Sequence, residues 1–309
     1  LPLGNEADVA TLVRLARRFR ASADVVLLTR VRDYWLGGMA AKLAGVRAIL
    51  RLGIVRRLRD RYIMDRLRYG VLPDAILVNA RETRRTLLKT PWIAPEKVHT
   101  IYNGVDAPGR SGAEQRDRIR RSLGVPPEAV FIVGAGRLAP EKRWEWLVDA
   151  AAQLMRDGVS VFTILLGVGD ERETLAERVS RHSLDTAFLL PGYRGDAEDI
   201  IGAADVVAHP SANEGIPNVV LEAMGREVPV VAANTGGVGE HFTDGENILL
   251  AERDDFHGFA ARLAVAVRDE NLRNRIGHNG FETVRNSFSW EGMTDALERL
   301  IDRIGGGEG

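Results

Sequence analysis

Residues 205–225 read DVVAHPSANEGIPNVVLEAMG and predict a buried strand, a loop and a helix in succession. The apolar run 205–210 is typical of a short strand, and 219–225 carries good helix formers at helical spacing. Pro217 suits the first turn of a helix. Free N–H groups and the dipole at a helix start attract an anion such as diphosphate. The stretch therefore predicts an anion site where the loop meets the helix.

Two carboxylates flank this anion site, Glu214 in the loop and Glu222 about one turn inside the helix. Glu222 is placed to accept hydrogen bonds from neutral hydroxyls, as carboxylates do with ribose in dinucleotide-binding folds. Glu214 is placed to accept hydrogen bonds from a second polyol. The pair suits a ligand with hydroxyls on both sides of a diphosphate. An isolated pair of this kind would equally be a loop charge and an exposed helix charge.

Working outward, the chain after residue 100 alternates short apolar runs with amphipathic segments. This alternation predicts an α/β domain with a parallel sheet, a Rossmann-like fold. Such sheets bind ligands beyond the carboxyl ends of their strands, where 134–142, 192–194 and 214–218 should converge. The predicted strands are 131–136, 161–167, 187–192, 205–210, 229–234 and 247–250, and the predicted helices are 144–156, 171–181, 197–203, 219–225, 254–268, 270–286 and 290–304.

The turn GAGRLAPEKR, residues 134–143, carries the strongest basic candidates for binding phosphate. Gly134 and Gly136 are expected to let the backbone approach an anion, Arg137 to form a bidentate fork and Lys142 to add a point charge. The run from Gly134 to Ala139 also fits the G-x-G-x-x-A dinucleotide pattern, so an NAD(P)-dependent oxidoreductase is an alternative. Pro140 argues against that alternative, because a dinucleotide-binding helix should already be running there.

The stretch from Glu214 to Glu222 resembles the Glu-x7-Glu motif of retaining glycosyltransferase family 4, within glycosyl transferases group 1. The resemblance extends to further motifs in the family's order: IYNGVD (101–106), GAGRLAPEKR (134–143), LLPGYRGD (189–196) and TGGVGEHFTDGENILL (235–250). It implies the GT-B fold, with two Rossmann-like domains of parallel sheets. It also implies a metal-independent hexosyltransferase that moves a sugar from a nucleoside-diphosphate sugar to a glycan, lipid-linked or other acceptor, with UDP favoured over GDP and no cofactor.

By this resemblance, Arg137, Lys142 and Glu214 are the expected catalytic residues, and no residue is expected to ligate a metal. The glutamates serve hydroxyl recognition, so the two-carboxylate scheme of glycoside hydrolysis does not apply. The expected donor-binding residues are Gly136, Tyr193, Arg194, Gly215, Ile216, Pro217, Asn218, Val219 and Glu222.

The N-terminal part departs from the family pattern. Strands are expected at 23–30, 48–53 and 74–80, with helices at 36–43 and 81–89, but the family's opening strand and glycine-rich loop are not found. Leu52 stands where the family often has a histidine. The expected organisation is an incomplete acceptor-side domain at 1–104, a nucleotide-sugar domain at 105–288 and a helix at 289–309 that returns to the first domain. A protein that binds a sugar nucleotide without transferring the sugar is a further alternative.

Charge is distributed unevenly along the chain. Residues 1–100 hold 20 Lys/Arg against 9 Asp/Glu, whereas residues 101–309 hold 22 against 34. The first part therefore favours an anionic partner. Its densest basic segment, from Ile54 to Gly70, predicts an amphipathic helix that contacts an anionic membrane; an arginine-biased surface helix is the alternative. No recognisable nucleic-acid module is found, so nucleic acid is not an expected partner.

Composition agrees with these expectations. Forty-five per cent of the residues are hydrophobic, which is enough to fill two domain cores, and there is no cysteine for disulfide or thiolate chemistry. No apolar run approaches the roughly 18 residues that span a bilayer. The expected location is cytoplasmic, with peripheral attachment to the inner face of the cell membrane as an option, and the expected pathway is envelope polysaccharide or glycolipid biosynthesis.

Overall fold

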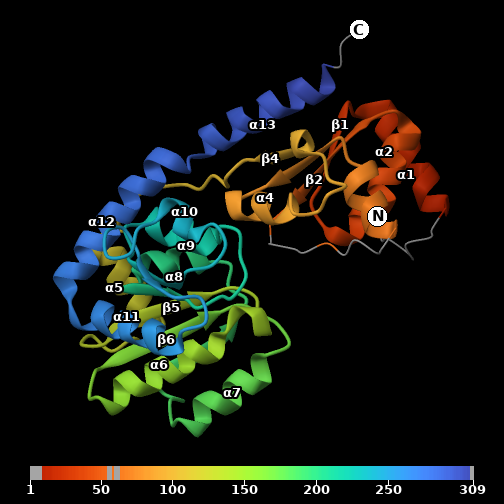
Figure 1. The fold of residues 1–309 in the computed structure, drawn as a ribbon. Coiled ribbons are helices and arrows are strands. Elements are labelled where there is room, and N and C mark those ends of the chain that lie inside the picture. The colour runs from red at the N-terminus through yellow and green to blue at the C-terminus, as the bar shows by residue number, and fades with distance from the viewer. Residues whose placement is uncertain (1–8, 54–57, 59–62, 307–309) are drawn as a thin grey trace. The chain divides into compact units, whose positions relative to one another are not determined.

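The computed structural model describes residues 9–53, 58 and 63–306, and these form two compact units (Figure 1). The first unit holds the described residues up to Asn103 together with those from Glu291 onward. The second unit runs from Gly104 to Trp290. Each unit is built on a parallel sheet, so the predicted α/β class with two Rossmann-like domains is confirmed.

The first unit carries a sheet whose spatial order follows the chain. The strands are β1 (Val25–Leu28), β2 (Arg47–Leu52), β3 (Ala75–Val78) and β4 (Val98–Thr100), and all neighbours are parallel. The helical elements are α1 (Val9–Ser22), α2 (Val31–Ala44), α3 (Ile63–Asp65), the π-helix η1 (Arg66–Val71), α4 (Arg81–Leu87), the 3₁₀ turn η2 (Pro95–Lys97) and α13 (Trp290–Gly305).

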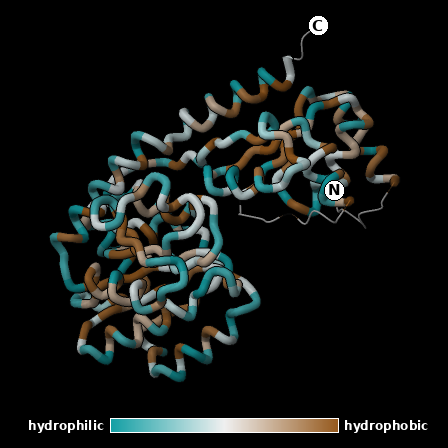
Figure 2. The backbone as a smooth tube through the Cα atoms, in the orientation of Figure 1, coloured by the Kyte–Doolittle hydropathy of each residue, from teal (hydrophilic) through white to brown (hydrophobic). Residues whose placement is uncertain are grey.

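Apolar packing joins α13 to this sheet. Leu300 is buried against Ile49 and Leu77, while Leu297 and Ile301 pack around the same cluster. Figure 2 shows hydrophobic residues concentrated in the strands and alternating with hydrophilic ones along α13. This alternation gives α13 one apolar face, which explains why a helix from the end of the chain belongs to the first unit.

The amphipathic helix predicted from Ile54 to Gly70 falls in part on positions 54–57 and 59–62, which lie outside the described residues. Its described part is not a regular α-helix, because three α-helical residues are followed by the π-helix η1. Gly70 lies in that π-helix, and a Cβ there would be 3.0 Å from the Trp92 ring. Close packing on Trp92 thus accompanies the irregular turn.

The second unit has a six-stranded parallel sheet in the order β10-β9-β8-β5-β6-β7. Its strands are β5 (Val130–Ala135), β6 (Val161–Leu166), β7 (Phe188–Gly192), β8 (Val206–His209), β9 (Val230–Ala233) and β10 (Leu249–Ala251). Its helical elements are α5 (Ala113–Ser122), the 3₁₀ turn η3 (Pro140–Lys142), α6 (Trp144–Arg156), α7 (Arg172–Arg181), α8 (Ala197–Ala203), α9 (Asn218–Met224), α10 (Val238–His241), α11 (Phe256–Arg268) and α12 (Glu270–Ser287).

Strand order in this unit reverses at β5. Chain order runs outward through β6 and β7 on one side of β5, and through β8, β9 and β10 on the other. Open α/β sheets bind ligands outside the carboxyl ends of their strands at such a switch point. The fold therefore brings the loop after β5 and the loop after β8 to one crevice, although 72 residues separate Lys142 from Glu214.

In the described part of the chain, no helix combines the length and the apolar character that a bilayer crossing requires.

Candidate functional site

Backbone contacts join the loops after β5 and β8. The amide of Ala212 donates to the carbonyl of Glu141 over 2.8 Å, and the Ser211 hydroxyl donates to the same carbonyl over 3.2 Å. From the other side, Arg253 donates to the Ala212 carbonyl through Nε at 3.0 Å and a terminal nitrogen at 2.8 Å. The loop ahead of Glu214 is thus fixed by two neighbouring segments.

Glu214 lies at the centre of this junction. Its Oε1 accepts hydrogen bonds from Lys142 Nζ, from the Ser211 hydroxyl at 3.1 Å and from His209 Nε2 at 3.3 Å. Only 8% of Glu214 is exposed. All three donors reach the same oxygen, so the carboxylate has a fixed orientation while Oε2 is not used by these contacts.

Electrostatics keep Glu214 ionised. Burial opposes the charge, but the hydrogen bond from His209 and the positive charge of Lys142 lower the pKa of Glu214 from 4.5 to about 2. Burial also lowers the pKa of His209, whose ring packs edge-on against Trp144. The imidazole is therefore neutral near pH 7 and acts as a hydrogen-bond donor, and Lys142 supplies the formal charge.

Glycines in the next loop allow a third segment to approach. Gly236 has φ +57°, and a Cβ at this position would lie 1.6 Å from the carbonyl oxygen of Glu214. The Gly237 amide donates to the Gly215 carbonyl over 2.7 Å. The segment from Thr235 to Gly237 thus packs directly on the backbone at Glu214, which explains the glycine pair ahead of α10.

Glu222 occupies a different environment, on α9. Pro217 caps this helix in an extended conformation, so it precedes the first turn instead of occupying it. Burial, together with the charge of Glu198, raises the pKa of Glu222, and Arg226 opposes the rise. Glu222 has no salt bridge within the described residues, unlike Glu214. A neutral hydroxyl is a suitable partner for such a carboxylate.

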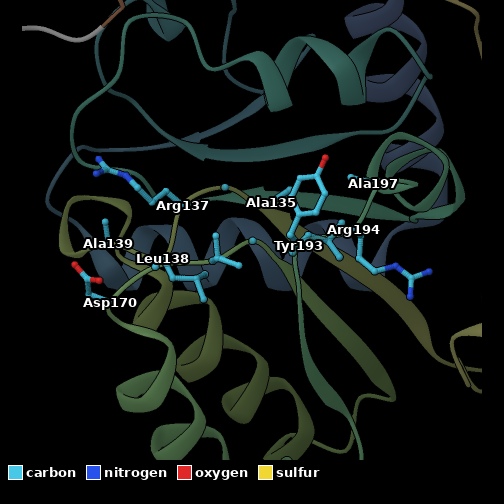
Figure 3. Close-up of a pocket in the computed structure, with 13 residues that line it drawn as sticks. Ala135, Arg137, Leu138, Ala139, Asp170, Tyr193, Arg194 and Ala197 are labelled. Carbon is cyan, nitrogen blue, oxygen red and sulfur yellow. The ribbon is translucent and has the colours of Figure 1, made fainter. Parts of the chain in front are cut away.

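A pocket of about 560 Å³ opens beside the switch point, at the carboxyl ends of β5, β6 and β7 (Figure 3). Tyr193 and Arg194 stand at one end of it, and Arg137, Leu138 and Asp170 lie at the other. Tyr193 is 80% exposed, an unusual state for an aromatic side chain. The pocket offers aromatic, aliphatic and backbone groups within reach of Arg137. Its lining residues are Ala135, Gly136, Arg137, Leu138, Ala139, Leu166, Gly167, Val168, Gly169, Asp170, Tyr193, Arg194 and Ala197.

Close contact between the loops after β5 and β6 forms the floor of this pocket. The Leu138 amide donates to the Val168 carbonyl over 2.9 Å. A Cβ on Gly167 would lie 1.9 Å from the Gly136 carbonyl oxygen, and one on Gly169 would lie 2.1 Å from that of Leu138. Both glycines have positive φ, so larger residues are excluded by conformation and by space.

The two predicted arginines form surface ion pairs. Arg137 pairs with Glu141, and its side chain is 62% exposed. Arg194 binds Asp196 in a bidentate arrangement with distances of 2.8 and 2.7 Å. Exposed pairs of this kind are weak, so an anionic ligand can exchange with the carboxylates at little cost. Their predicted contact with a donor remains a prediction.

One sequence-based interpretation is wrong. Gly134 lies inside β5, where a Cβ would be 2.8 Å from the Leu147 side chain and 3.0 Å from the Trp144 ring. Its hydrogen side chain therefore makes room for α6, and it does not line an anion site. Because α6 begins only at Trp144, the helix of the G-x-G-x-x-A dinucleotide motif is missing after Gly136. The geometry thus disfavours the oxidoreductase alternative.

Sequence reasoning missed several residues of this site. The sequence pattern places His209 and Ser211 only in a strand and the loop after it, although they hold Glu214. The segment from Gly167 to Asp170 was missed too. Its signal was present in the sequence, because two glycines follow a strand that is buried at every position.

The described residues contain no group of three or more His, Asp or Glu side chains that could hold an ion.

Comparison with known proteins gives one family. The family described as glycosyl transferases group 1 matches residues 115–283, more than half of the chain. The lipopolysaccharide core biosynthesis glycosyltransferase LpsE of Rhizobium meliloti is 30% identical over 236 residues, covering 76% of this chain and 66% of that protein. A D-inositol 3-phosphate glycosyltransferase of Saccharomonospora viridis is 34% identical over 236 residues, covering 72% of this chain and 54% of the relative. The chain thus spans between half and two thirds of these relatives.

Solved structures show the same fold. Anabaena HepE in complex with UDP and glucose has a TM-score of 0.86 at 20% identity, over 97% of this chain and 84% of that one. Sucrose-phosphate synthase from Thermosynechococcus elongatus has a TM-score of 0.81 at 20% identity, over 98% of this chain and 80% of that one. These are GT-B glycosyltransferase structures, and the predicted fold is confirmed. The family match at residues 115–283 covers most of the second unit, including its switch-point site. The chain therefore belongs to the glycosyl transferases group 1.

Proposed function

We propose that this protein is a retaining, metal-independent hexosyltransferase of family 4 that uses a nucleoside-diphosphate sugar. One observation carries the proposal: the partly buried Lys142–Glu214 pair lies at the switch point of the second sheet. That is where α/β folds bind nucleotides. The family match supports the reaction class, and the chain's shorter span relative to its curated relatives makes the activity of the whole protein part of the proposal.

The donor's base and ribose are assigned to the pocket of about 560 Å³ and its border. The base would lie against the aliphatic wall and the exposed ring of Tyr193, with backbone groups near Arg194 reading its edge. Glu222 would accept hydrogen bonds from the ribose hydroxyls. A partly buried carboxylate with a raised pKa gains a partner in this way without meeting another charge.

The diphosphate is assigned to Arg137 and Lys142, with Gly136 and the start of α9 beside it. The start of α9 provides Gly215, Ile216, Pro217, Asn218 and Val219 as the remaining donor-binding residues. Glu214 would accept a hydroxyl of the transferred sugar through Oε2, because Oε1 already accepts three hydrogen bonds.

The chemistry follows from this placement. Transfer breaks the bond between the anomeric carbon and the β-phosphate oxygen, and the leaving diphosphate gains negative charge. Arg137 and Lys142 would stabilise that charge, as preorganised cations do in other phosphate-leaving reactions. The acceptor hydroxyl bonds to the anomeric carbon, and its proton passes to the leaving diphosphate. Retention of configuration rests on the resemblance to family 4.

The acceptor and location belong to the same proposal. The relative LpsE is named for lipopolysaccharide core biosynthesis, and HepE was solved with UDP and glucose. These names favour UDP as the nucleotide and a glycan or lipid-linked acceptor in envelope polysaccharide or glycolipid biosynthesis. The acceptor-side domain would be residues 1–104 with the helix at 289–309, and the donor domain 105–288. The protein would act in the cytoplasm, with the basic segment from Ile54 to Gly70 at an anionic membrane.

Calorimetric titration of the chain with UDP, GDP, ADP and NAD⁺ tests the donor site. We expect one nucleoside diphosphate, UDP, to bind and its affinity to fall in Glu222→Gln. The matched control is Glu227→Gln, because Glu227 lies just beyond α9 and outside the proposed site. Binding of NAD⁺ alone would overturn the proposal. Nucleotide binding without sugar release from any UDP-sugar, in a protein of full family length, would favour a binding protein.

A further inference from the structure

A second pocket, of about 390 Å³, lies in the first unit and takes no part in the proposed donor site. It opens at β4, the edge strand of the four-stranded sheet, between residues of α4 and α13. Figure 1 shows β4 running beside α13. The polar side chains that line it are Arg84, His99, Thr100, Arg299 and Arg303.

Two of the arginines have their positions set by α13. Ala296, Arg299, Leu300 and Arg303 follow the i, i+3, i+4, i+7 pattern and share one face of α13. Leu300 is 3% exposed in the core of the unit, so it anchors the helix and holds both arginines at the pocket rim. The small side chain of Ala296 leaves space beside them.

The pocket is cationic and uncompensated. Arg84 donates to the carbonyls of Val98 at 3.1 Å and Pro95 at 3.4 Å. Within the described residues, no carboxylate forms an ion pair with Arg84, Arg299 or Arg303. By contrast, the two arginines that line the pocket of the second unit, Arg137 and Arg194, each pair with a carboxylate. Three guanidinium groups around one cavity without a carboxylate call for an anion from outside the chain.

His99 supports this description of the field. Burial, followed by the charges of Arg303 and Arg84, lowers the pKa of His99. The ring is therefore neutral near pH 7 and able to donate one hydrogen bond. The hydroxyl oxygen of Thr100 is buried and has no hydrogen-bond partner within the described residues. The pocket thus combines three guanidinium groups with a neutral imidazole, and the Thr100 hydroxyl is buried in its wall.

We propose that this pocket binds a phosphate group esterified to a larger molecule. Guanidinium groups recognise phosphate through bidentate hydrogen bonds, and they outperform ammonium groups in doing so. A cavity of about 390 Å³ is larger than one phosphate and leaves room for the group that carries it. The carrier is either a phospholipid headgroup or a soluble phosphate ester. Arg84 and His99 come from the basic part of the chain, where residues 1–100 carry 20 Lys/Arg against 9 Asp/Glu, and α13 adds Arg299 and Arg303.

Histidine-ring NMR with inorganic phosphate as the probe tests the site. We expect the His99 signal, assigned by its loss in His99→Gln, to move saturably with phosphate and not with chloride at equal ionic strength. His278, an exposed histidine of the second unit, is the internal reference. The response should be lost in the double variant Arg299→Gln/Arg303→Gln and kept in Arg85→Gln, an exposed arginine of α4 that does not line the pocket.

Vesicles identify the carrier. Cosedimentation with phosphatidylglycerol vesicles, but not phosphatidylcholine vesicles, that is lost in the same double variant would assign a lipid headgroup. A phosphate response without such cosedimentation would assign a soluble ester. Unchanged circular dichroism shows that the variants fold. A His99 signal that ignores phosphate, or that responds equally in the double variant, would overturn the proposal, whatever the outcome of the nucleotide titrations.

Discussion

Replacing Glu214 by glutamine should separate folding from donor binding. Its pKa of about 2 in place of 4.5 corresponds to about 3 kcal/mol, at 1.36 kcal/mol per pH unit. Because the folded-state pKa is lowered, this stabilisation is present above pH 4.5 and is lost as the pH falls towards 2. Glu214→Gln keeps the shape of the side chain but removes the charge at every pH. It also leaves the Lys142 ammonium, whose side chain is 16% exposed, without its partner.

Amide hydrogen exchange in β5 and β8 measures the loss, since these strands lie at the centre of the second sheet. A loss of about 3 kcal/mol should speed exchange through opening of this unit by about 150-fold at pH 7. The method reports each unit separately, so it does not require the whole chain to unfold in one step.

Glu222→Gln is the matched control, eight residues along the same stretch. Burial raises the pKa of Glu222, so its charged form is disfavoured in the folded state and the neutral glutamine should leave exchange unchanged or slower at pH 7. The same variant should weaken UDP binding. The reasoning about the two carboxylates would be refuted if Glu214→Gln exchanged its amides at the wild-type rate, or if both variants accelerated exchange equally.

Three further changes probe the same site. Lys142→Met should raise the pKa of Glu214, measured by carboxyl ¹³C NMR, because the positive charge of Lys142 no longer offsets the effect of burial. An unchanged pKa would show that Lys142 does not stabilise the carboxylate. Gly236→Ala places a Cβ 1.6 Å from the Glu214 carbonyl oxygen, so it should lower the free energy of unfolding of the second unit by more than about 2 kcal/mol, measured with urea. Gly245→Ala is the control, because Gly245 has a similar φ but open space around it, and it should lower that free energy by less than half as much. Arg137→Gln should change the free energy of unfolding by less than about 0.5 kcal/mol, because the side chain is exposed. It should nevertheless slow sugar release from UDP-glucose by about tenfold or more in radiolabel assays. Full activity of this variant would show that Arg137 takes no part in the mechanism.

Most of the second unit could be predicted from its sequence. Helices α6 and α8 begin and end where the amphipathic pattern places them, and the six strands match apolar runs bounded by turn residues. Strand β4 of the first unit was not predicted. It has three residues, two of them the polar His99 and Thr100, and its pairing with β3 defines it. The helix α5 was also missed, because its mostly charged sequence buries no residue.

The candidate site was only partly predictable. Loop positions and residue types pointed to Lys142 and Glu214 separately. Their direct contact depends on β8 lying next to β5, a neighbourhood that no local pattern contains. For the same reason His209 read as an ordinary strand residue, although it donates to Glu214. Gly134 illustrates the opposite error, since a glycine required for helix packing resembles one required for ligand approach.

The most direct test of the donor site is photolabelling with 5-azido-UDP-glucose followed by peptide mapping. The pocket in Figure 3 predicts labelling in the segments 135–139, 166–170 or 193–197, and excess unlabelled UDP should abolish it. Labelling confined to the first unit, or labelling that UDP does not reduce, would contradict the assignment of the donor to this pocket.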